Sequence, residues 1–150
     1  MISTMKIFQV CPRCHPHIGG VEYVVKSISE ALAEQGHNVT IVAGEANIDK
    51  PCEENLNNVH IVRWPTWAPD DAYHIPRRGL ELQVKLEKLF RDIDILHIHS
   101  IHAVITYCAW KAYRAYRMSG SRLIVTPYYH GSAHTQLRRI LWLMWRIHSK

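Results

Sequence analysis

Residues 36–43 read Gly-His-Asn-Val-Thr-Ile-Val-Ala, and this stretch decides the fold. Gly36 is typical of the residue that ends a helix, because glycine takes the left-handed backbone conformation there without strain. Residues 38–43 then form a strand that is apolar on both faces, as in a parallel sheet with helices on either side. The helix before Gly36 carries one apolar stripe, made of Val21, Val24, Val25, Ile28 and Leu32.

The same alternation of strand and helix extends in both directions from this stretch. Further strands are expected at Lys6–Cys11, Val59–Trp64, Asp94–His99 and Arg122–Thr126. Further helices are expected at 80–90, 103–118 and 135–148, with an irregular loop at 64–76. Strands that alternate with helices predict an α/β fold, a Rossmann-like three-layer α/β/α domain whose parallel sheet has at least five strands.

Length, charge and composition limit the classes of protein to consider. The chain has 150 residues, which predicts one domain. Its net charge of +5 favours acidic partners such as nucleotides or anionic lipids. No apolar run approaches the roughly 18 residues of a membrane span. Residues 1–10 lack the features of a signal peptide, so we expect a cytoplasmic protein whose four cysteines form no disulfide framework.

Polar motifs lie in the loops after the strands, where parallel sheets bind their ligands. Gly19 and Gly20 precede the first helix, whose free N–H groups suit a phosphate or a carboxylate. Glu22, in the first turn, complements the positive end of the helix dipole. A plain turn explains the two glycines equally well, so an anion site and a turn both stay open.

Two further groups of polar residues follow the fourth and fifth predicted strands. His99 and His102 stand at the end of the fourth strand, where we expect His99 to meet a ligand and His97 to be an interior, hydrogen-bonded residue. Residues 127–132 bring tyrosines, an imidazole and a hydroxyl around a glycine. Aromatic rings with a few polar groups suit the recognition of a sugar. A tyrosine-rich surface loop is the alternative interpretation.

The segment Cys11-Pro12-Arg13-Cys14-His15 matches patterns of metal and redox sites. With His17 it could supply four zinc ligands, but no second ligand pair with the spacing of a zinc finger follows. Cys11 also belongs to an apolar strand, where it acts as a small hydrophobic residue. We therefore expect neither a metal nor a cofactor. The G-x-G-x-x-G fingerprint of dinucleotide sites is missing, and no nucleic-acid recognition motif is present.

Two of the expected helices combine aromatic and basic residues. In the helix at 135–148 the residues are Arg138, Arg139, Trp142, Trp145 and Arg146. In the helix at 103–118 they are Tyr107, Trp110, Lys111, Tyr113, Arg114, Tyr116 and Arg117. Such helices can lie on an anionic membrane surface, or they can pack on the sheet with a solvated basic face. Both interpretations stay open.

Four stretches together resemble the N-terminal domain of family 4 glycosyltransferases, which have the GT-B fold. They are the loop ending in Gly19-Gly20-Val21-Glu22, residues 36–42, residues 94–100 (DILHIHS) and residues 125–131 (VTPYYHG). They occur in order and with matching spacing over nearly the whole chain. The resemblance implies a domain on the acceptor side of a two-domain enzyme, with the C-terminal, donor-binding domain absent from residues 1–150.

The resemblance also implies a reaction and a set of site residues. The reaction is transfer of a sugar from a nucleotide-sugar donor to a glycan or lipid-linked acceptor, with retention of configuration and without a metal. The implied catalytic residue is His130, with Tyr128 as the alternative alignment. The implied substrate-binding residues are Gly19, Gly20, Glu22, His99, His102, Tyr128 and Gly131.

Three functions are therefore under consideration. The first is the acceptor-binding half of a glycosyltransferase, inactive as an isolated fragment and peripheral at the cytoplasmic face of the membrane. The second is a small metal-binding or redox module built on Cys11, Cys14, His15 and His17. The third is a non-catalytic anion- or nucleotide-binding module that uses only the glycines before the first helix.

Overall fold

The structure is a computed structural model that describes residues 3–117 and 119–128. Its strands are β1 (Lys6–Cys11), β2 (Asn38–Glu45), β3 (Cys52–Leu56), β4 (Val59–Trp67), β5 (Ile75–Pro76), β6 (Ile95–His99) and β7 (Arg122–Thr126). Its helices are α1 (Gly20–Glu34), α2 (Gly79–Phe90), α3 (Val104–Tyr116) and the short 3₁₀ helix η1 (Pro69–Asp71).

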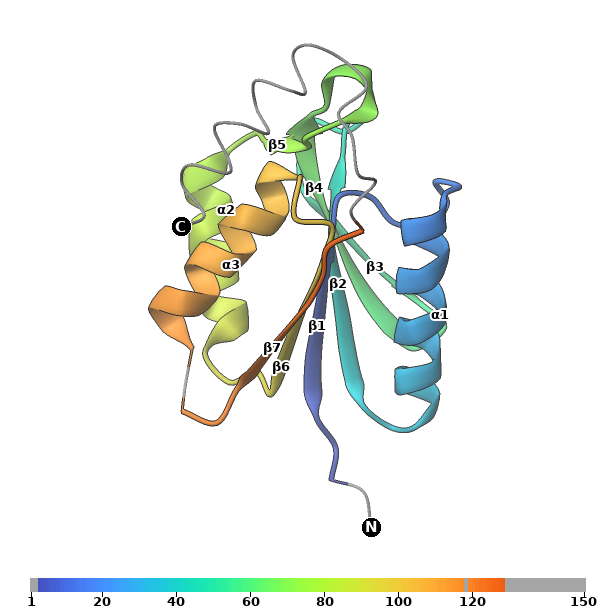
Figure 1. Cartoon of the computed structure of the whole chain (residues 1–150), viewed down its shortest axis with the longest axis vertical. Helices are drawn as coiled ribbons and strands as arrows, with labels where there is room; N and C mark the ends of the chain where they lie inside the picture. The colour runs from blue at the N-terminus through green and yellow to red at the C-terminus, as the bar shows by residue number, and fades with distance from the viewer. Residues whose placement is uncertain (1–2, 118, 129–150) are drawn as a thin grey trace.

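The described strands form one seven-stranded sheet in the order β3-β4-β2-β1-β6-β7, with β5 pairing to β4 (Figure 1). The neighbours from β4 through β2, β1 and β6 to β7 are parallel. The chain first adds strands on one side of β1 and then crosses to the other side with β6. The strand order therefore reverses between β1 and β6, and such switch points are where open α/β sheets bind ligands.

Helices cover both faces of the sheet, so the expected three layers are confirmed (Figure 1). α1 lies on one face, where Val25 packs with Val39, Ile41 and Ile61. α2 and α3 lie on the other face over the larger core. Among the residues of this core are Phe8, Val10, Leu82, Leu86, Phe90, Leu96, Ile105 and Tyr113. The Rossmann-like α/β fold follows directly from strands that are apolar on both faces.

Two strands, β3 and β5, were not expected from the sequence. β3 is exposed along its whole length and pairs antiparallel with β4 through the two-residue turn at Asn57 and Asn58. An exposed edge strand has no buried face, and therefore no apolar alternation to detect. The prediction of an irregular loop at 64–76 is wrong in part, because β4 continues to Trp67 and β5 pairs with the end of β4.

The remaining expected elements are close to those observed. The helix expected at 103–118 is α3, at Val104–Tyr116. The strand expected at Asp94–His99 is β6, at Ile95–His99. The helix expected at 135–148 lies outside the described residues. So do His130 and Gly131, whose predicted roles stay predictions.

Candidate functional site

The glycine turn before α1 lies at the carboxyl edge of the sheet, which is the side at which the parallel strands end. Around Gly20, no heavy atom lies within 4 Å of the position that a Cβ would take. Beside Gly19 the space is filled, because a Cβ there would lie 2.3 Å from Oε2 of Glu22. Glu22 itself is only 7% exposed. Its carboxylate therefore lies over the turn and complements the helix N-terminus, while the space beside Gly20 stays open.

Arg13 connects this turn to the segment after β4. Its Nε and Nη2 atoms each lie 3.0 Å from Oε1 of Glu22, and its Nη1 lies 2.5 Å from Asp71. The guanidinium side chain is 23% exposed, so the pairs are only partly screened by water. Arg13 therefore joins the glycine turn to the segment that holds Asp71.

A buried polar cluster lies at the switch point between β1 and β6. The His99 ring is fully buried, with Nε2 2.5 Å from Oε1 of Gln9 and Nδ1 3.2 Å from the hydroxyl oxygen of Tyr128. The His97 ring lies beside it, with centroids 3.8 Å apart. Burial, followed by the neighbouring His97, lowers the pKa of His99 to about 3. His99 is therefore neutral at physiological pH.

His97 has a partner of its own on the neighbouring strand. Its Nε2 lies 2.8 Å from Oγ1 of Thr126 on β7. Its ring is partly buried, and burial lowers its pKa. His97 is hydrogen-bonded, as expected, but it is only half-buried, whereas His99 is fully buried with Tyr128 stacked beside it. The expectation that His99 meets a ligand stays a prediction. His102 lies partly buried in the turn that follows β6, at the same edge.

A second buried histidine, His74, stands where the ends of β2 and β4 meet. Its Nδ1 lies 3.2 Å from Oγ1 of Thr66, and burial, followed by the charge of Arg13, lowers its pKa. Gly44 makes room for it, since a Cβ at Gly44 would lie 2.6 Å from the carbonyl oxygen of Pro12 and 2.9 Å from His74. His74, Gln9 and Arg13 belong to this region of the fold, and none of them was expected there from the sequence.

Strained backbone gathers in the loops of this edge. Left-handed φ values occur at Asp70, Asp71, Tyr73, His74, Arg78, Ser100 and Tyr128, which all follow β4, β6 or β7. Such conformations are unfavourable for residues other than glycine and are concentrated at functional sites. The other non-glycine examples in the described ranges are Asn57 and Asn58, which form a hairpin turn that uses them routinely.

The cysteine and histidine residues of the C-x-x-C-H segment do not converge. Cys14 Sγ accepts a hydrogen bond from Arg63 at 3.2 Å, and burial raises the pKa of Cys14 to about 11. Cys11 is buried in β1, where burial raises its pKa. His17 instead pairs with Glu45 at 2.7 Å. Within residues 3–117 and 119–128 no three His, Cys, Asp or Glu side chains gather around a common point.

His17 and Glu45 form a partly buried pair at the end of β2. Burial works to raise the pKa of Glu45, but the hydrogen bonds from His17 and from the Asn47 amide outweigh it. Together with the positive charges of His17 and Arg63, these hydrogen bonds hold the pKa of Glu45 below its ordinary value. Glu45 is therefore ionised at neutral pH and already engaged by the protein.

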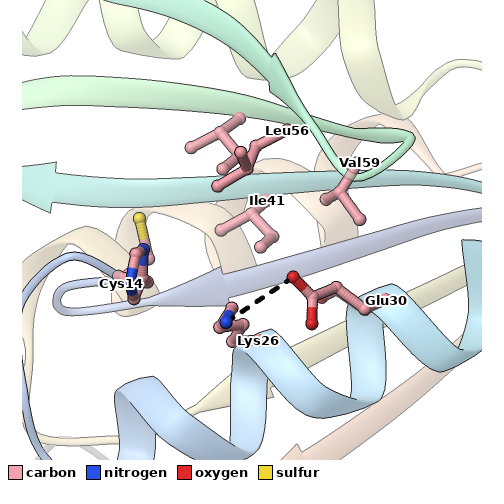
Figure 2. Close-up of a pocket in the computed structure, with 9 residues that line it drawn as sticks. Cys14, Lys26, Glu30, Ile41, Leu56 and Val59 are labelled. Atoms are coloured by element: carbon pink, nitrogen blue, oxygen red, sulfur yellow. Dashed lines mark ion pairs between the residues drawn. The ribbon is translucent and has the colours of Figure 1, made fainter.

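A small pocket lies between α1 and the sheet, away from the switch point (Figure 2). Lys26 and Glu30 of α1, paired at 3.8 Å, face Ile41 and Val59 across it. Its cavity volume is about 20 Å³, close to the space of a single water molecule. The pocket is therefore too small for a sugar or a nucleotide.

The fold and the edge together define a class: a Rossmann-like domain with its polar groups at the switch point of a parallel sheet. The chain belongs to Glycosyltransferase Family 4, whose family model matches residues 18–150. A search of curated proteins finds no match.

Two solved glycosyltransferases have a similar fold. One is the catalytic domain of starch synthase IV from Arabidopsis thaliana bound to ADP and acarbose (TM-score 0.53, 15% identity, covering 83% of this chain and 34% of that chain). The other is an alpha-glucosyltransferase in complex with UDP and a 13-mer DNA containing a HMU base (TM-score 0.51, 20% identity, covering 97% and 36%). The chain spans about a third of the length of either structure.

None of the helices in the described part of the chain has the length and hydropathy needed to cross a membrane.

Proposed function

We propose that this chain is the acceptor-binding half of a glycosyltransferase. The enzyme transfers a sugar from a nucleotide-sugar donor to a glycan or lipid-linked acceptor, with retention of configuration, and a second domain binds most of the donor. The observation that carries the proposal is the cluster of buried polar groups at the switch point of a family 4 domain. The two solved relatives hold ADP and UDP, which supports a nucleotide-linked donor.

Each part of the edge has a task in this proposal. The open space beside Gly20 and the N–H groups at the start of α1 receive an anionic group of the donor or acceptor. Tyr128 and the edge around His99 hold hydroxyl groups of a sugar by hydrogen bonds. Because His99 stays neutral, it orients groups and does not supply a proton. His130, which the family resemblance implies, would face the reacting sugar.

Half of a cleft positions only one of the two substrates. Transfer depends on holding both in line and on stabilising the charge that develops between them. We therefore expect the isolated 150-residue chain to transfer no sugar.

The test is to compare the protein expressed from its complete gene with the 150-residue chain. Both are incubated with a panel of UDP-, ADP- and GDP-sugars together with glycan and lipid-linked acceptors, and acceptor-dependent release of the nucleoside diphosphate is measured. We expect release from at least one donor with the complete protein and none with the chain alone. Full-strength nucleotide binding by the chain alone, with no release by either protein, would favour the non-catalytic anion-binding module instead.

We further propose that the protein is cytoplasmic and lies peripherally on an anionic membrane, where it meets a lipid-linked acceptor. The support is the outer face of α3, where Tyr107 is 50% exposed and the Arg114 guanidinium lies 5.1 Å above the Trp110 ring. Aromatic rings with basic neighbours suit the headgroup region. Co-sedimentation with phosphatidylglycerol vesicles should weaken at high salt and after Arg114→Glu. It should be kept after Arg91→Glu, a charge reversal at the residue that follows α2; equal loss in both variants would refute this surface.

A further inference from the structure

A chain of hydrogen bonds connects the middle of the sheet to its carboxyl edge. Gln9 is fully buried in β1, where it is in register with Ile41 on β2 and His97 on β6. Its Oε1 lies 2.5 Å from Nε2 of His99, and Nδ1 of His99 lies 3.2 Å from the Tyr128 hydroxyl oxygen. One amide, one imidazole and one phenol are thus connected in series.

The chemistry of these groups fixes the direction of each hydrogen bond. An amide oxygen only accepts, so Nε2 of His99 must carry a hydrogen and donate it to Gln9. A neutral imidazole has one such hydrogen, so Nδ1 is an acceptor. The Tyr128 hydroxyl therefore donates its hydrogen inward to Nδ1. Its oxygen lone pairs are left to accept a hydrogen bond from another group.

Gln9 is an unusual residue to find at this depth. Its side chain is 0% exposed, and its Nε2 has no hydrogen-bond partner in the part of the chain that the structure describes. A buried donor without a partner is unfavourable, so the amide weakens the core where an apolar residue would strengthen it. A polar side chain that lowers the stability of the core is expected at a functional site.

We propose that Gln9 is a positioning residue of the acceptor site. By accepting from Nε2 it fixes the tautomer of His99, which turns the Tyr128 hydroxyl hydrogen inward and directs the oxygen lone pairs to a hydroxyl group of a bound sugar. This proposal rests on the proposed function. It assigns a task to a residue that touches neither the ligand nor the solvent.

The first test is the tautomer of His99, read from the ¹⁵N chemical shifts of its imidazole at pH 7 in the 150-residue chain. We expect the Nε2–H form in the wild type and in Gln9→Glu, whose carboxylate also accepts. Gln9→Met has a similar size but no acceptor, and it should populate the Nδ1–H form. An Nδ1–H tautomer in the wild type, or an unchanged tautomer in Gln9→Met, would overturn the proposal.

The second test measures sugar transfer by the protein from its complete gene. Gln9→Met should raise KM for the acceptor about tenfold with little change in kcat, as the loss of one hydrogen bond does. Gln9→Glu should restore most of the affinity, and Gln9→Met should add little to Tyr128→Phe. An unchanged KM in an active Gln9→Met enzyme overturns the positioning role. A wild-type enzyme without transfer overturns the proposed function instead, and the ¹⁵N result tells the two failures apart.

Discussion

At the scale of single residues, the carboxyl edge is built from buried polar side chains that the rest of the core avoids. Gln9, His74 and His99 are each at most 1% exposed. Each is held by a specific neighbour, and burial lowers the pKa of both histidines. The groups that prepare this edge for a ligand are therefore groups that reduce the stability of the fold in acid.

This arrangement predicts how stability depends on pH. The unfolded chain protonates its histidines near pH 6.5, whereas the folded chain resists protonation of His74, His97 and His99. The stabilisation is complete above pH 6.5 and is lost as the pH falls toward the folded pKa, which is about 3 for His99. His99 alone should account for a fall of about 1–2 kcal/mol in unfolding free energy between pH 7 and pH 5.

Urea denaturation at the two pH values measures this fall. The variant His99→Gln keeps a polar group but cannot titrate, so its fall should be smaller than that of the wild type by the amount assigned to His99. The same pH dependence in His99→Gln and in the wild type would show that His99 is not a buried neutral group.

At the scale of elements, the turn between β3 and β4 determines how the edge of the sheet is closed. Asn57 and Asn58 both have positive φ, at 50° and 63°, as in the two-residue turn that suits the twist of a hairpin. Leu56 and Val59 pair directly across it. β3 then covers the edge of β4 with a strand whose residues are all exposed and include two glutamates, which opposes pairing with other chains.

The hairpin gives a prediction for stability. Asn58→Gly removes the steric cost of a left-handed backbone and should raise the unfolding free energy by about 0.5–1 kcal/mol. Asn58→Val places a β-branched side chain in the same conformation and should lower it by at least about 1 kcal/mol. Thermal denaturation compares the two variants. Equal midpoints would mean that the turn does not have the observed conformation.

The elements also show what the sequence can predict. The five parallel strands could be predicted to within a few residues because apolar runs bounded by turns are the pattern of a buried strand. β3 could not, because its residues bury no face. Gln9 was missed for a related reason: one glutamine within the apolar run KIFQVC does not change the pattern, and its partner His99 is distant along the chain.

At the scale of the whole molecule, β1 and β6 are neighbours at the place where the strand order reverses (Figure 1). The buried polar pair Gln9 and His99 belongs to these two strands. The glycine turn, the Arg13 network and the cluster around His99 follow β1 and β6, which come from separate parts of the sequence. The glycines and histidines of this edge could be predicted from the sequence. Arg13 and His74 could not, because their contacts with Asp71 and Thr66 form only in the folded chain. In the proposed function, this edge holds the acceptor.

The most direct test of the central claim compares two glutamate substitutions in the sugar-transfer assay of the complete protein. Gly20 and Gly79 each begin a helix, and each has open space where a Cβ would lie, but they stand on opposite faces of the sheet. Circular dichroism checks that both variants fold. The proposal predicts that Gly20→Glu lowers kcat/KM at least about a hundredfold, because it places a carboxylate where a substrate anion binds, and that Gly79→Glu stays within about twofold of the wild type. Full activity in a folded Gly20→Glu variant would contradict the assignment of the carboxyl edge as the substrate site.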